Sequence, residues 1–154
     1  MVMAKIGDEV VNQPLRLVVR FDYRGVNRPK GLFFSSKNVE LIAEETRDNQ
    51  AALLRNVPLQ GVHIENIDTT SETYTIFDEE AGIQVAYAPA LVTIRADMLE
   101  DVVRFILREE FRKLELLEPE QIVFNKYDLE RFLFKVHDQF QSLQTALERR
   151  SSQR

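Results

Sequence analysis

Residues 15–23 have the sequence Leu15-Arg16-Leu17-Val18-Val19-Arg20-Phe21-Asp22-Tyr23. Apolar side chains occupy alternate positions from Leu15 to Tyr23, and the charged side chains of Arg16, Arg20 and Asp22 lie between them. Because successive side chains of a β-strand point to opposite faces, this period of two predicts a strand with one buried face.

Three further stretches, residues 61–67, 73–77 and 83–94, have the composition of strands. The acidic segment Asp78-Glu79-Glu80-Ala81-Gly82 joins the last two and favours a hairpin loop. Proline has no N–H to donate, so Pro89 predicts that the last stretch is divided or lies at a sheet edge. Together these stretches predict an antiparallel meander.

Apolar residues at helical spacing predict one inserted helix near residues 38–56, between the first strand and the meander. Ser36 or Asn38 is suited to be its N-cap, and Pro58 follows the last periodic residue. The polar run Arg47-Asp48-Asn49-Gln50 leaves open whether this helix is continuous.

After Arg95 the period becomes helical again. Acidic residues at the start favour a helix, and its predicted apolar face comprises Leu99, Val102, Val103, Ile106, Leu114 and Leu117. A second helix is predicted to start at Asn125, with Asp128 three residues on, and its apolar residues continue from Leu129 to Leu147. The C-terminus is therefore expected to be a pair of amphipathic helices.

These elements predict an α+β domain. We expect an antiparallel sheet of about four or five strands, one inserted helix, and the C-terminal pair of amphipathic helices packed on the sheet. Residues 1–14 are expected to form a partly ordered N-terminal tail, residues 15–150 a single domain, and residues 151–154 a frayed C-terminal tail. The pattern leaves the strand order open.

Composition limits the classes of function. The 154-residue chain has no cysteine, which excludes disulfides, thiolate nucleophiles and cysteine-ligated metals. A net charge of -5 gives no general attraction to phosphate backbones, so nucleic-acid binding is not expected. Asp8 and Glu9 interrupt the apolar core that a signal peptide would need, and no run is long enough to span a bilayer. We expect a soluble cytoplasmic protein.

The short motifs of phosphate loops, dinucleotide sites, nucleophile elbows and zinc proteases are missing from the sequence. We therefore predict no catalytic, cofactor-binding or metal-ligating residue, and lean against an enzyme.

Two groups of polar residues remain candidates for a site. His63 and Glu65 would share one face of a strand and form a polar pocket pair. Arg24, Arg28 and Lys30 would form an anion-binding loop.

Some apolar residues lie outside the main stripes of the two C-terminal helices: Phe105, Leu107, Leu116, Tyr127 and Phe134. Either a deeper core covers them or they form an interface with a second copy or another protein. The leading hypothesis is a non-catalytic interaction or regulatory protein that acts as a homo-oligomer through its C-terminal helices. The alternative is a small-ligand-binding domain or enzyme with a pocket between the sheet and the long helix.

Overall fold

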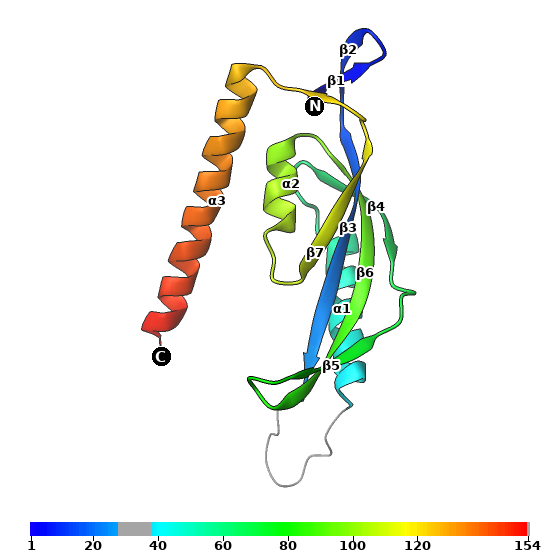
Figure 1. Ribbon diagram of the computed structural model, residues 1–154, viewed down its shortest axis with the longest axis vertical. Helices are drawn as coiled ribbons and strands as arrows, with labels where there is room; N and C mark the ends of the chain where they lie inside the picture. The colour runs from blue at the N-terminus through cyan, green and yellow to red at the C-terminus, as the bar shows by residue number, and fades with distance from the viewer. Residues whose placement is uncertain (28–37, 154) are drawn as a thin grey trace.

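The computed structural model describes residues 1–27 and 38–153 and confirms the α+β class (Figure 1). In chain order the elements are β1 (Val2–Ile6), β2 (Glu9–Gln13), β3 (Leu15–Val26), α1 (Val39–Asn56), β4 (Val62–Asp68), β5 (Tyr74–Asp78), β6 (Ile83–Ala96), α2 (Leu99–Ile106), β7 (Phe111–Glu118), β8 (Ile122–Val123) and α3 (Lys126–Ser152). The main sheet has five antiparallel strands, in agreement with the number expected.

β3 and β6 form the centre of this sheet. They pair along the whole of β3, from Leu15 opposite Ala96 to Val26 opposite Val85. The order is β4-β6-β3-β7, with β5 also paired to β6. The alternating apolar residues of β3 are buried, as the period of two predicts. β3 is therefore the central strand of the domain core.

Pro89 lies in the middle of β6, opposite Asp22. On the other side of β6, β5 pairs up to Tyr87 and β4 pairs from Leu91 onward. Pro89 thus occupies the interval between these two outer strands, where no described strand needs the N–H that proline lacks. The strand passes through this position without a break.

Two helices contribute to one core on the same face of the sheet. α1 is continuous through its polar run and buries Ala43, Ala51 and Leu54. From α2, the Phe105 ring meets the Phe21 ring of β3 edge-on, with centroids 5.5 Å apart. The other face of β3 carries the charged residues Arg16, Arg20, Asp22 and Arg24 together with Val18.

α1 approaches β3 closely at Gly25. A Cβ atom at this position would overlap the backbone oxygen of Val39 and the backbone nitrogen of Ala43. Ala43 packs here with Ala86 and Ala88 of β6. Small residues on both sides therefore set the short distance between helix and sheet.

The first predicted C-terminal helix ends at Ile106, and the prediction was wrong beyond that point. Residues 111–118 form β7, which pairs with β3 and leaves Leu114 and Leu117 on a strand. Within this short segment apolar residues fit both a helical and a strand period. Hydrogen bonding to the open edge of β3, which the segment's own sequence does not show, favours the strand.

A second, three-stranded sheet involves the N-terminal residues, for which the sequence predicted no element. β1 and β2 form a hairpin through Gly7, which has a φ of 61°, and β8 pairs with β1 on its other side.

The last helix also differs in detail from the prediction. α3 has no buried residue and lies beside α2 instead of packing on the sheet.

Candidate interaction surface

α3 begins at a capping box formed by Asn125 and Asp128, as the sequence predicts. The Asn125 side chain accepts a hydrogen bond from the backbone N–H of Asp128 (N···O 2.9 Å), and the Asp128 carboxylate accepts one from the backbone N–H of Asn125 (3.3 Å). These bonds satisfy backbone donors that the first turn of a helix leaves unpaired. The first turn of α3 is thus fixed by its own residues.

An ion pair ties this end of α3 to α2. Arg131 Nε donates to Glu100 Oε1 at 2.7 Å, and Arg131 Nη2 donates to Asp128 Oδ1 at 3.1 Å. The hydrogen bond to Glu100 is the main reason that the pKa of Arg131 is raised above its ordinary value. Solvent screens such a pair, so it orients α3 more than it stabilises the fold.

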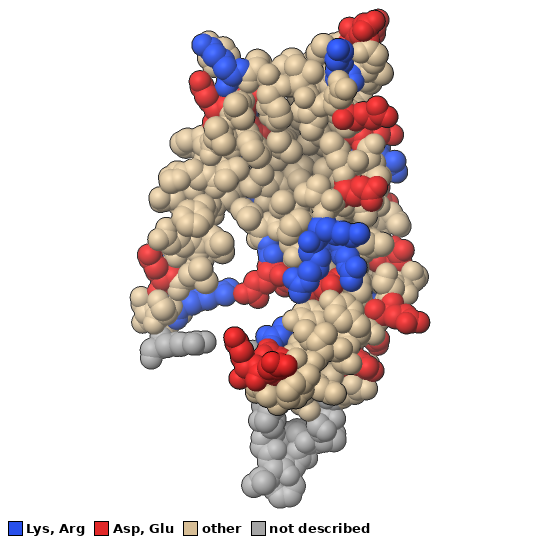
Figure 2. Space-filling view, in the orientation of Figure 1, with Lys and Arg blue, Asp and Glu red and all other residues tan. Residues whose placement is uncertain are grey.

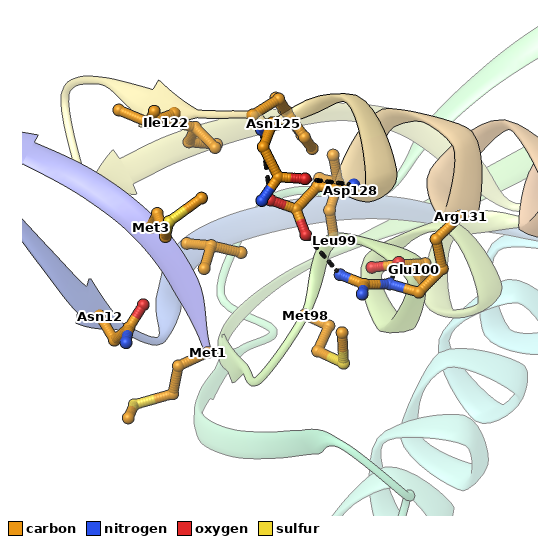
Figure 3. A pocket seen from close by; sticks show the side chains of 13 residues that line it. Met1, Met3, Asn12, Met98, Leu99, Glu100, Ile122, Asn125, Asp128 and Arg131 are labelled. Carbon is orange, nitrogen blue, oxygen red and sulfur yellow. Dashed lines mark hydrogen bonds and ion pairs between the residues drawn. The ribbon is translucent and has the colours of Figure 1, made fainter.

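A hollow of about 300 Å³ lies at the base of α3, between the small sheet, the start of α2 and the first turns of α3 (Figure 3). Met1, Met3 and Met98, which are all the methionines of the chain, line it. Figure 3 shows that several polar side chains around it are bonded to one another: Asn125, Asp128, Glu100 and Arg131. The hollow thus combines methionine side chains with polar side chains whose hydrogen bonds are largely satisfied by one another.

Only one side of α3 faces the rest of the chain. Asp128, Phe132, Lys135 and Gln139 are half-buried, and the Phe132 ring lies 6.4 Å from that of Phe124. From Phe140 to Gln153 every residue is exposed. Figure 2 shows open space between the middle of α3 and the rest of the molecule. α3 is therefore an arm attached near its N-terminal end.

One flank of this arm carries an uncovered apolar stripe, called the seam below: Leu129, Leu133, Val136, Phe140, Leu143 and Leu147. Each of these side chains is between 40% and 60% exposed. Their spacing alternates between four and three residues, which is the a/d pattern of a coiled coil. At 3.6 residues per turn, the seam lies about a quarter turn around the helix from the half-buried side. The face that a helix normally buries is open along most of α3.

Phe105, the first of the predicted interface residues, lies in the core of the chain itself. It is 2% exposed and packs against Phe21. The Arg108 guanidinium covers both rings, 5.1 Å from the Phe105 centroid and 5.8 Å from that of Phe21. Its own chain therefore covers Phe105, which is not available at the surface.

The other predicted interface residues are exposed, on two parts of the chain. Leu107 and Leu116 lie at the end of α2 and on β7. Tyr127 and Phe134 lie seven residues apart on α3, so they share one face, and this face is separate from the seam. Their role at an interface stays a prediction.

His63 and Glu65 lie on β4 but have different partners, and a β-bulge between Ile64 and Asn66 falls at Glu65. Glu65 accepts hydrogen bonds from Arg16 (2.8 Å) and Arg95 (2.7 Å). The bond from Arg16 is the main reason that the pKa of Glu65 is lowered. His63 Nε2 lies 3.7 Å from Asp97 Oδ1 at the surface. The structure does not bring the predicted pair into one pocket.

The predicted anion-binding loop is described only at Arg24, because Arg28 and Lys30 lie outside the described residues. Arg24 Nη2 is 3.6 Å from Asp78 Oδ2. It lines an open polar hollow of about 540 Å³ together with Asp22 and Arg112. Anion binding by this region stays a prediction.

Asp22 is a buried charged residue, and the sequence did not predict that several side chains would contact it. Its side chain is 2% exposed and accepts hydrogen bonds from Arg20 (2.8 and 3.2 Å) and from the Tyr74 hydroxyl (2.6 Å). Arg112 Nε lies 3.7 Å away. These contacts give the buried carboxylate its hydrogen-bond partners and link β3 to β5 and β7. We therefore assign Asp22 a structural role.

In the part of the chain that the structure describes, no group of three or more His, Cys, Asp or Glu side chains is placed to hold a metal ion. Among the same residues, no helix has both the length and the apolar composition needed to cross a bilayer.

Comparisons with protein-family models, with curated proteins and with solved structures find no match to this chain. A function can therefore be argued only from its own geometry.

Proposed function

We propose that this chain is a non-catalytic interaction protein that acts as a homo-oligomer through α3. The observation that carries the proposal is the exposed seam of α3. A helix of 27 residues with no buried residue gains little from its own chain, yet it carries an apolar stripe at coiled-coil spacing. Such a stripe is stabilised when another helix covers it.

The size of the seam supports association. Covering a half-exposed leucine or phenylalanine side chain stabilises a complex by about 1 kcal/mol. The seam side chains of one helix therefore contribute several kcal/mol, and a second copy contributes the same amount. This gain has to offset the loss of translational and rotational freedom on association.

The residues beside the seam favour a second copy over a charged partner. The positions flanking it are Glu130, Phe132, His137, Gln139, Gln144 and Ala146, which include one acidic residue and no lysine or arginine. In coiled coils, charges at these positions select the partner. Two identical copies of α3 would meet with little charge repulsion along the seam.

The alternative, a small-ligand site between sheet and long helix, has less support. The hollow that comes nearest to this description lies at the base of α3, where its polar groups bind one another. His63, Glu65 and Arg24 do not line it.

Light scattering coupled to size exclusion tests the proposal. We expect wild-type protein to be a dimer or larger at micromolar concentration, and the double variant Leu133→Lys/Phe140→Lys to be a monomer with an unchanged far-UV circular dichroism spectrum. The control is Thr145→Lys, which places one lysine on the opposite side of α3 and should leave the oligomer intact. A wild-type monomer at all concentrations, or a double variant as large as wild type, would refute the proposal.

A further inference from the structure

We infer that two copies of α3 pair antiparallel, with a two-fold axis at the level of Asp138. This inference rests on the proposed function and goes further, since it specifies the orientation and the residues that meet. It follows from the order of spacings and side-chain sizes along the seam.

The seam has the same spacing from either end. From Leu129 to Leu147 the intervals are four, three, four, three and four residues, and their midpoint is Asp138. In an antiparallel pair centred there, every seam residue lies opposite a seam residue. Leu129 meets Leu147 of the second copy, and Leu133 meets Leu143 of the second copy. The surface is therefore complementary to itself, as a two-fold interface requires.

The sizes of the central side chains favour this orientation over a parallel one. In the antiparallel pair Val136, the smallest seam residue, lies opposite Phe140 of the second copy, the largest, and the arrangement occurs twice. A parallel pair would place two phenylalanines in one layer and two valines in another. One layer would be overpacked and the other would leave a void, and both are destabilising.

The ends of the seam are also symmetric. The next positions of the pattern are Lys126 before Leu129 and Arg150 after Leu147, and both lie twelve residues from Asp138. Charged residues thus end the apolar seam at the same distance on either side, and like charges meet at both ends in a parallel as well as in an antiparallel pair. The helix dipoles oppose each other in this arrangement, which is favourable for adjacent helices. The seam lies about a quarter turn from the side of α3 that faces α2, so a second copy can approach without displacing α2.

Disulfide cross-linking tests the orientation, because the natural chain has no cysteine and every thiol is one that is introduced. The two variants are Leu129→Cys and Leu147→Cys, each at an exposed position. They are oxidised separately and as an equimolar mixture, then separated on a non-reducing gel. In the antiparallel pair, positions 129 of the two copies are about 27 Å apart along the helix axis, far beyond a disulfide.

We expect cross-linked dimer in the mixture and its near-complete loss in either variant alone. Cross-linking of each variant by itself would show a parallel pair and overturn the inference, while leaving the proposed function intact. A dimer in light scattering that cross-links in no sample would also overturn it. Thr145→Cys, on the opposite side of α3, measures cross-linking by random collision. The pair Leu133→Cys and Leu143→Cys repeats the test one layer further in.

Discussion

α1 and α3 are both amphipathic, but only α1 has residues that are buried by the rest of the chain. α1 has 18 residues and buries Ala43, Ala51 and Leu54 against the sheet. α3 has 27 residues and buries none. An amphipathic pattern therefore shows that a helix has a face to cover, and it does not show which surface covers it.

The residues on the two faces explain the difference. The face of α1 includes small residues that fit closely against Gly25, Ala86 and Ala88, so its shape matches this one sheet. The seam of α3 consists of large, regularly spaced residues, which pack well against another helix with the same spacing. Side-chain size, more than hydrophobicity, separates a helix covered by its own chain from one that is left open.

The largest effect that tests this comparison is expected at two phenylalanines. Phe105→Ala should lower the free energy of unfolding by about 3–5 kcal/mol, because it empties a buried site beside Phe21. Phe134 is 70% exposed on α3 and lies outside the seam, so Phe134→Ala should change it by less than about 0.5 kcal/mol. Urea denaturation at one fixed protein concentration measures both. Similar losses for the two variants would show that α3 is covered in solution on this face too.

A smaller effect is expected where α1 meets β3. Gly25→Ala adds a Cβ that overlaps the backbone of Val39 and Ala43, which cannot move aside as a flexible side chain can. We expect a loss of about 1–3 kcal/mol, the usual cost of overpacking. Gln141→Ala on the exposed side of α3 is the control and should be close to neutral. If Gly25→Ala has wild-type stability in urea, the close approach of α1 is not a constraint.

The smallest effect concerns two tyrosines at high pH. Tyr23 is 2% exposed, and its hydroxyl has no hydrogen-bond partner among the described residues. Burial raises its pKa from 10.0 to about 12. Between these values the unfolded chain releases the proton and the folded chain keeps it, so stability falls as the pH rises from about 10 to 12.

Tyr23→Phe should therefore lose less stability than wild type between pH 9 and pH 11, measured by urea denaturation. At neutral pH it should be unchanged or slightly more stable, because it removes an unpaired buried hydroxyl. Tyr127→Phe is the matched control, since Tyr127 is exposed on α3, and it should follow wild type at every pH. Identical alkaline losses in all three proteins would contradict the assignment to Tyr23.

Most of the main sheet could be predicted from sequence because its strands and α1 carry long, clear periods. β7 could not, because its short segment fits two periods and the choice depends on the edge of β3. β8 could not either, because its Ile122 pairs with Ala4, a contact between distant parts of the chain. Local patterns contain no information on such pairings.

The candidate site was predicted only in part. The regular spacing from Leu129 to Leu147 was visible, but it was interpreted as a face packed on the sheet, since an open and a covered stripe have the same sequence. Phe105 lies off the main stripe of its short helix, and its burial depends on Phe21, more than eighty residues earlier. The bulge that gives His63 and Glu65 separate partners has no signature in the residues around it.

The attachment of α3 has a mechanical consequence. Its last half-buried residue is Gln139, and beyond it the helix continues to Ser152, about 20 Å at 1.5 Å per residue. Because the whole helix is about 40 Å long, any tilt at its base is magnified at its far end. In an antiparallel pair this far end lies beside the base of α3 in the other copy. A change of tilt at the base of one helix would therefore act on the base of the other.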